Sequence, residues 1–251
     1  MFEKIDSLSR LPRKAREELK NFCSGLKKLL GNDLLGLVLY GSALRDDFMP
    51  NHSDINILVL VKEVDVSLLR KVAPLVGRAN QRALIEPLFL TPEYIKTSLD
   101  TFPLEYLDIK RQNLLLYGED IFSEIEIDRK DLRLQVEREW KLNYIRLQQA
   151  YLRSYKDSEA LKKIMIKSFN SFTHLLSAIY YLRDSLPEER HLVWDSLMRE
   201  FFIREEIINW LKSLREKKEK IGKEEIHNRF NEYLKMMERI MFALESFGKE
   251  G

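Results

Sequence analysis

The sequence predicts an α+β protein in which a domain of alternating strands and helices is followed by an all-helical bundle. In the first half of the chain, short apolar runs bounded by turn-forming residues alternate with amphipathic helical patterns. Beyond about residue 124, only helical periodicity remains. A charged segment, Glu119–Lys130, separates the two patterns. We therefore expect two domains, at residues 1–123 and 124–251.

The elements of the first half follow from the length of each apolar run and from the residues that bound it. Short runs between Gly, Pro and polar residues favour buried strands over helices. Longer stretches with apolar residues three or four positions apart favour helices. Strands are expected at residues 37–40, 55–61 and 83–91, and helices at residues 13–31, 64–77 and 92–99.

The second half carries apolar and aromatic residues three or four positions apart, which predicts one buried stripe per helix. Roughly four or five such helices would form a bundle. The aromatic members of the first stripe could line a substrate or base-stacking surface, but helical spacing favours core packing. The first two stripes are Val136, Trp140, Tyr144, Leu147, Tyr151 and Tyr155, then Leu161, Met165, Phe169, Phe172, Leu176 and Ile179; the pattern continues at 192–202, 207–214 and 226–247.

Composition narrows the classes of function. The 42 Lys and Arg residues nearly balance the 40 Asp and Glu residues, which gives no support for the basic face of a dedicated nucleic-acid binder. Cys23 is the only cysteine, so an internal disulfide and a cysteine-based zinc site are excluded. The charged N-terminus lacks a signal-peptide core, and no charge-free run reaches membrane-spanning length. We expect a cytoplasmic protein without membrane or nucleic-acid partners.

The most specific feature joins the first two expected strands, in the stretch LVLYGSALRDDFMPNHSDINILVLV. Side chains alternate along a strand, so Asp54 and Asn56 should point to one face. Gly41 has no Cβ and lets the backbone approach a ligand closely. Ser42 is expected to begin a short helix over residues 42–47, whose first N–H groups favour an anion. The pattern predicts a site for a triphosphate carried by a divalent ion.

The ordered set of Gly41-Ser42 followed by Asp54-x-Asn56 in an apolar strand resembles the nucleotidyltransferase fold of the DNA polymerase β superfamily, which includes minimal and aminoglycoside nucleotidyltransferases. The resemblance covers about the first half of the chain. It implies a mixed sheet with flanking helices, ATP or another nucleoside triphosphate as substrate, and Mg²⁺ as cofactor. It assigns nucleotide binding to Gly41 and Ser42, and metal binding to Asp54 and Asn56, with Asp54 also catalytic. The implied activity is transfer of a nucleoside monophosphate to a hydroxyl of a small molecule or protein.

The family pattern also implies a third carboxylate from a later strand, and Glu86 is the candidate. It is the only charge in the apolar run at 83–91, where an unpaired carboxylate would be costly to bury. The resemblance gives Glu86 a catalytic and metal-binding role. The alternative is an edge strand, compatible with Pro87, on which Glu86 faces water. Asp100 and Glu105 are further candidates, although Asp100 is expected to cap the helix that follows it.

Two more residues near the motif have polar side chains that suit a nucleotide. Arg45 follows the Gly41-Ser42 turn closely enough to reach a phosphate, and a solvated surface arginine is the equal alternative. His52 could touch a nucleotide, but a loop histidine without a role is favoured.

Asn56 departs from the family pattern, which has a second carboxylate at this position. An amide oxygen can still ligate a hard cation, but one negative charge is missing and metal affinity should fall. Two interpretations stay open: a metal-dependent nucleotidyltransferase, or a catalytically degenerate nucleotide-binding or protein-interaction module of the same fold. The helical second domain is similar to that of aminoglycoside-modifying enzymes, in which the acceptor binds between domains or across a dimer. The acceptor stays unidentified, and a homodimer stays open.

Overall fold

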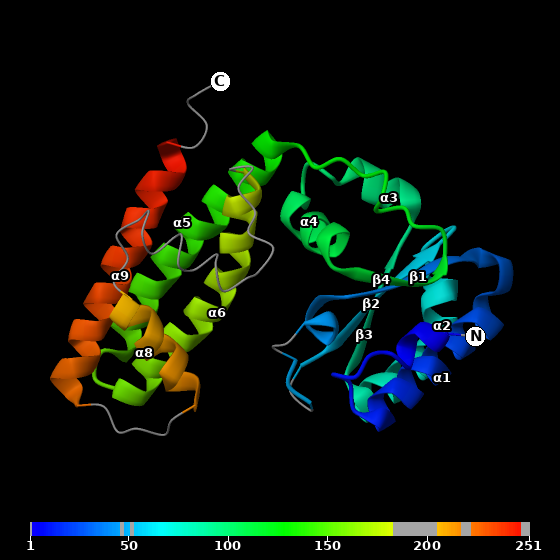
Figure 1. Cartoon of the computed structure of the whole chain (residues 1–251), viewed down its shortest axis with the longest axis horizontal. Helices are drawn as coiled ribbons and strands as arrows, with labels where there is room; N and C mark the ends of the chain where they lie inside the picture. Colours follow the sequence, from blue (N-terminus) through cyan, green and yellow to red (C-terminus); the bar gives the residue numbers. More distant parts are fainter. Residues whose placement is uncertain (1, 46–47, 51–52, 183–204, 217–221, 247–251) are drawn as a thin grey trace. The chain divides into compact units, whose positions relative to one another are not determined.

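The computed structural model describes residues 2–45, 48–50, 53–182, 205–216 and 222–246. Contacts within the chain divide it into two compact units, Met1–Ile127 and Asp128–Gly251. His52 and the helical pattern expected at 192–202 lie outside the described residues. Figure 1 shows a sheet with flanking helices in the first unit and a group of helices in the second. The predicted α+β class is therefore confirmed.

The first unit is built on a four-stranded mixed sheet with the order β3-β2-β1-β4. Strand β1 is antiparallel to both β2 and β4, whereas β2 and β3 are parallel. The strands are β1 (Leu34–Tyr40), β2 (Ile55–Val61), β3 (Ile85–Leu90) and β4 (Asn113–Gly118). The mixed sheet that the family resemblance implies is thus present, and β2 has the bounds that its apolar run predicts.

Strand β1 begins three residues before its expected start, because Gly36 lies within the strand and does not end it. Gly36 pairs with Leu60 of β2 and with Gly118 of β4. A Cβ at position 36 would lie 2.9 Å from Leu60 Cδ1, so glycine here allows a neighbouring side chain to cross the strand. In this strand, glycine therefore marks close packing rather than a turn.

Helices α1 (Arg13–Leu30) and α2 (Val66–Ala83) cover one face of the sheet (Figure 1). Their buried side chains form one core with the apolar residues on that face of β1, β2 and β3. Helix α2 continues six residues past its expected end, because its core-facing stripe extends through Ala79. Members of this core include Leu19, Phe22, Leu26, Leu37, Leu39, Ile55, Ile57, Val59, Val72, Ala79 and Ile85.

Helices α3 (Pro92–Thr97) and α4 (Pro103–Arg111) lie toward the opposite face of the sheet (Figure 1). On that face Leu58 and Leu60 of β2 are also buried, because they alternate with the residues of the first core. The prediction that Asp100 caps α4 is wrong. The N-cap of α4 is Phe102, without a side-chain cap, and the Asp100 carboxylate accepts a hydrogen bond from Thr101 Oγ1 at 3.0 Å.

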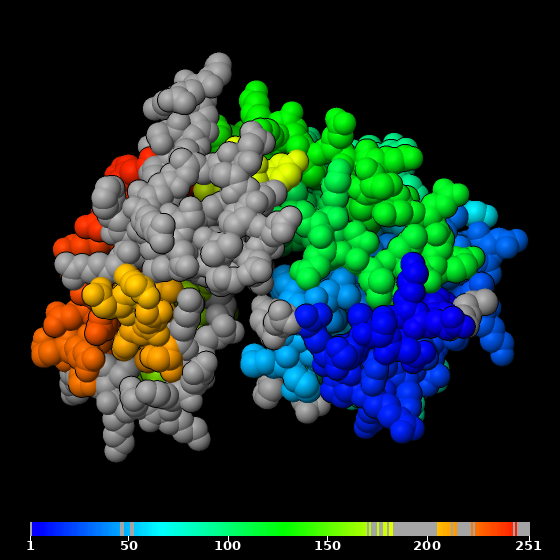
Figure 2. All heavy atoms as spheres, viewed as in Figure 1, coloured from blue at the N-terminus to red at the C-terminus, as the bar shows by residue number. Residues whose placement is uncertain are grey.

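The N-terminal 3₁₀ turn η1 (Glu3–Ile5) packs on the same unit. Lys4 Nζ donates a hydrogen bond to the carbonyl of Leu115 in β4 at 3.0 Å, and Ile5 is fully buried. In Figure 2 the dark-blue N-terminal residues accordingly lie beside green residues of the same unit. The start of the chain thus covers part of the surface of the unit that contains the sheet.

In the second unit, every element of the described residues is a helix: α5 (Arg129–Ser154), α6 (Ser158–Leu182), α8 (Glu205–Glu216) and α9 (Lys223–Ser246). Trp140 of α5 is fully buried, and its Nε1 donates to the carbonyl of Met237 in α9 at 2.8 Å. The predicted bundle is confirmed for these helices.

Core packing describes only part of the aromatic stripe of α5. Trp140 is in the core, and Tyr151 packs against Phe230 with ring centroids 4.7 Å apart while its hydroxyl meets His227 Nδ1 at 2.9 Å. Tyr155, however, is 51% exposed. The stripe stops there because α5 ends at Ser154 and Tyr155 is only its C-cap.

Candidate functional site

The site begins where β1 ends and the chain turns at Gly41. Gly41 has φ of +80°, a conformation that residues with a Cβ rarely adopt. A Cβ at this position would also lie only 3.0 Å from Asn56 Nδ2. Tyr40, the last residue of β1, is in register with Asn56 of β2. The turn therefore lies directly against the Asn56 amide, and both the backbone and the space favour glycine.

The turn itself is shorter than the sequence predicts. The short helix expected over residues 42–47 is present only as a 3₁₀ helix, η3 (Gly41–Leu44), because the backbone is already extended at Arg45. Ser42 Oγ donates instead to the carbonyl of Asp54 at 3.3 Å. A serine hydroxyl has one proton to donate, so in this arrangement it is directed at the backbone that precedes β2.

The core determines the direction of the polar side chains of β2. Ile55 and Ile57 are buried in the core formed with α1 and α2. Because side chains alternate, Asn56 and the residue before the strand, Asp54, face away from that core. Asp54 is exposed and Asn56 is half-buried. The apolar residues thus fix a register that presents one carboxylate and one amide on the same side.

Glu86 lies beside Asn56 on the neighbouring strand. The two residues are register partners in the parallel β2–β3 pair, and adjacent strands are about 4.8 Å apart. Their side chains therefore share a face of the sheet. Strand β3 is also the edge of the sheet, and Glu86 is exposed there, as the alternative interpretation of this run expects. Pro87 is tolerated for the same reason.

Asn80 is a further polar neighbour of Glu86, from the polar stretch Arg78–Arg82 whose residues the sequence predicts to be ordinary helix-end and loop residues. It lies in the last turn of α2, and its side-chain Nδ2 donates to Glu86 Oε1. Its backbone carbonyl accepts from Leu84 N at 2.8 Å, and the Leu84 carbonyl accepts from Ile55 N at 2.9 Å. The corner between α2 and β3 is thus bonded to the start of β2. An Asn six residues before a strand carboxylate is the only sequence signal for this contact.

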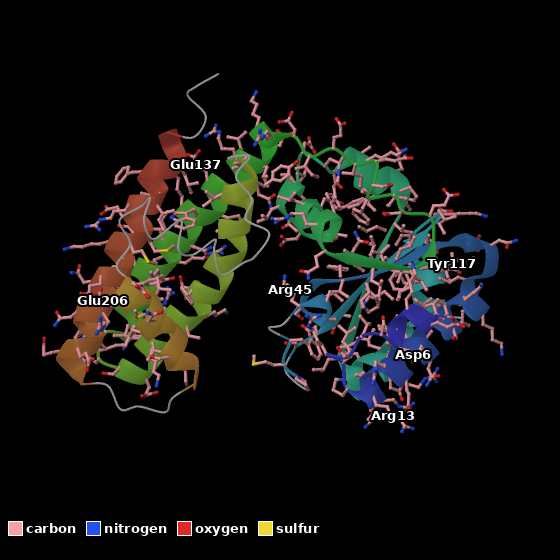
Figure 3. All side chains as sticks on the ribbon, viewed as in Figure 1. Asp6, Arg13, Arg45, Tyr117, Glu137 and Glu206 are labelled. Atoms are coloured by element: carbon pink, nitrogen blue, oxygen red, sulfur yellow. The ribbon has the colours of Figure 1, made fainter. Side chains whose placement is uncertain are left out.

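The structure does not bring every candidate to this place. Asp100 lies in the turn between α3 and α4, and Glu105 lies in the first turn of α4, so neither is on the strands that carry Asn56 and Glu86. Arg45 directly follows η3, with its backbone N–H bonded to the Ser42 carbonyl at 2.9 Å. Figure 3 labels Arg45 on this loop.

The donor set of the site is two carboxylates and one neutral amide, Asp54, Glu86 and Asn56. Across the residues that the structure describes, no group of three or more His, Cys, Asp and Glu side chains could hold a metal ion. Tyr40 adds no charge, because burial raises the pKa of its phenol. Carboxylate and amide oxygens are the kinds of ligand that a hard cation takes.

Comparisons with known proteins add little to this geometry. No protein-family model and no curated protein matches the chain. Among solved structures, the chain is similar to spectinomycin adenyltransferase AAD(9) from Enterococcus faecialis, determined with ATP and spectinomycin. The two are 16% identical with a TM-score of 0.45, over 88% of this chain and 98% of the other. Within its described helices, the chain has none that is long and apolar enough to span a membrane.

Proposed function

We propose that the first unit binds a nucleoside triphosphate together with Mg²⁺, and that the chain transfers a nucleoside monophosphate from it to a hydroxyl of a small molecule or protein. One observation carries the proposal: Asn56 is bracketed by the Gly41 turn and by Glu86. The turn approaches the Asn56 amide at one side, and Glu86 is its register partner at the other. Ser42 joins the turn to Asp54. The tight turn, the Asn56 amide and Glu86 are therefore neighbours, and the turn is bonded to the backbone of Asp54.

The residues of the site fit Mg²⁺ only in part. Mg²⁺ prefers oxygen ligands and is usually bound through one or two carboxylates together with substrate phosphates and water. Asp54, Asn56 and Glu86 would hold it, with the phosphates completing the coordination. When bound, Mg²⁺ supplies stabilisation of the negative charge that develops on the attacking and leaving oxygens.

The side chains of the site would divide the work. Gly41, which carries no side chain, would let the backbone of the turn come close to the phosphates. Ser42 would have to rotate its hydroxyl away from the Asp54 carbonyl in order to donate to a phosphate. Arg45, which directly follows the 3₁₀ helix η3, would supply a guanidinium suited to phosphate oxygens. Glu86, exposed on the edge strand, would accept the proton of the acceptor hydroxyl.

Asn56 favours a second candidate function, a module that binds nucleotide without turning it over. A neutral amide stands between Gly41 and Glu86, where a carboxylate would add charge. Two unit charges about 4 Å apart interact by about 4 kcal/mol at an effective dielectric near 20, and a divalent ion doubles this value before solvation offsets most of it. The cation that arrives with the nucleotide tolerates this loss better than one held by side chains alone.

The experiment that separates the two functions uses ATP and GTP labelled at the α-phosphate. Transfer of label to a metabolite or protein, with release of pyrophosphate, supports the enzyme. Binding of Mg-ATP without transfer supports the non-catalytic module, and in that case Asn56→Asp should create turnover. If the chain neither transfers label nor changes its melting temperature with Mg-ATP, both candidates are wrong, because a ligand at 100 times its Kd stabilises a protein by about 2.7 kcal/mol.

A further inference from the structure

We infer that Asn80 is a positioning residue of this site, which holds the Glu86 carboxylate beside Asn56. This inference rests on the proposed function, since it concerns how the chain prepares a ligand for a cation. Asn80 itself touches neither nucleotide nor cation in this account. It acts through Glu86.

The hydrogen bonds of Asn80 join three elements at one corner. Its Nδ2 donates to Glu86 Oε1 on β3. Its carbonyl accepts from Leu84 N, where the left-handed backbone, φ of 51°, ends α2. Leu84 in turn accepts from Ile55 N at the start of β2. The same residue therefore ends the helix and fixes a side chain on the strand that follows.

Glu86 needs such a partner because it lies exposed on an edge strand. A glutamate side chain has several rotatable bonds, and holding it in one rotamer costs conformational entropy. A carboxylate has about four lone-pair positions, and the bond from Asn80 occupies one of them. Asn80 is the one hydrogen-bond partner of the Glu86 side chain among the residues that the structure describes, so Oε2 and the other lone pairs would stay available to a cation. Asn80 thus orders the carboxylate without using it up.

Asn80 carries no charge, and this also keeps the Glu86 carboxylate available to a cation. A lysine or arginine at this position would pair with Glu86 and compete with a divalent cation. Arg82, two residues further along α2, is instead paired with Glu18 of α1 at 3.4 Å. The corner therefore offers Glu86 an amide donor that leaves its negative charge in place.

The test measures binding of the complex of Mn²⁺ and a non-hydrolysable ATP analogue to the full chain, from the enhancement of the water-proton relaxation rate that protein-bound Mn²⁺ causes relative to the complex alone. Asn80→Ala removes the donor and keeps a good helix former at this position. We expect it to weaken Mn²⁺ binding about tenfold or more, as loss of a residue that orients a metal ligand usually does. Gln81→Ala, at an exposed position of the same helix, is the matched control and should bind as the wild type does.

A double-mutant cycle distinguishes positioning from a general structural effect. If Asn80 acts through Glu86, Asn80→Ala should change Mn²⁺ affinity little in a Glu86→Gln background. An equal loss in both backgrounds would overturn the inference, as would wild-type affinity in the single variant. If the wild-type chain itself binds no Mn²⁺ with the analogue, the proposed function fails and the inference fails with it. If the wild type binds Mn²⁺ and the Asn80→Ala variant binds it equally well, the role of Asn80 is wrong but the proposed function is not.

Discussion

At the start of β2, the side chains on the two faces of the strand differ in their surroundings. On one face, Ile55 and Ile57 are almost completely buried in the core with α1 and α2. On the other, Asp54 is exposed and Asn56 is half-buried, Ser42 Oγ donates to the Asp54 carbonyl, and Glu86 of β3 is the register partner of Asn56. Ile55 and Ile57, on the buried face, fix the register that presents Asp54 and Asn56 on the other side, although further along that side Leu58 and Leu60 are buried as well. Substitutions of Ile55 and Ile57 should therefore act mainly on stability, and substitutions of Asp54 and Asn56 mainly on nucleotide and cation binding.

The largest effect is expected on the buried face, for Ile57→Ala. Ile57 is fully buried, and truncating such a residue usually costs about 2–5 kcal/mol of unfolding free energy. Urea denaturation of the full chain measures this loss. Val64→Ala, at a 41% exposed position just beyond β2, is the control and should stay within about 0.5 kcal/mol of the wild type. A loss below about 1 kcal/mol for Ile57→Ala would contradict the division between the faces.

Asp54→Asn should give the opposite result, a loss of function at unchanged stability. The change removes one of the two carboxylates of the site. If about 3 kcal/mol of transition-state stabilisation depends on it, transfer of label from ATP falls more than about 100-fold. Stability should change by no more than about 0.5 kcal/mol, because Asp54 is exposed. Asp100→Asn, which removes an exposed carboxylate in the α3–α4 turn, is the matched control and should keep the wild-type activity. An equal loss of activity in that variant would contradict the assignment of the site to Asp54.

Gly41→Ala should affect both stability and nucleotide binding. Because φ is positive at this position, alanine should lower the stability of the protein by about 1–2 kcal/mol. The alanine Cβ would also lie too close to Asn56 Nδ2. We expect weaker binding of Mg-ATP in addition to the loss of stability. Gly77→Ala is the contrasting variant, because nothing lies within 4 Å of a Cβ there and its helix should gain about 0.4–1 kcal/mol. Unchanged Mg-ATP affinity in Gly41→Ala would show that the turn does not take part in binding.

Ser42→Ala should have the smallest effect and shows whether the hydroxyl leaves its bond to the Asp54 carbonyl. If the hydroxyl turns to a phosphate, Mg-ATP affinity falls by about fivefold, which corresponds to about 1 kcal/mol. Ser53→Ala removes a similar bond in the same loop, from Met49 N at 3.0 Å, and should leave affinity unchanged. Equal affinities in the two variants would restrict Ser42 to holding the loop.

The difference between the faces also explains what the sequence could predict. The run Ile55–Val61 is apolar apart from Asn56, so the sequence predicts both the strand and the alternation of its side chains. The sequence does not predict that Asn56 is the register partner of Glu86, because the register between strands separated by a whole helix depends on tertiary packing. The contact of Asn80 with Glu86 has the same origin. The helix expected after Ser42 is shorter than predicted, because the chain becomes extended at Arg45, and the Ser42 hydroxyl bonds to the Asp54 carbonyl.

Calorimetry of ATP binding to the full chain, with and without Mg²⁺, tests whether the site binds a nucleotide together with a cation. We expect binding that requires Mg²⁺ and that weakens in Asp54→Asn and in Glu86→Gln, since both carboxylates would hold the cation. Binding of equal affinity without Mg²⁺, or no binding under either condition, would contradict this expectation.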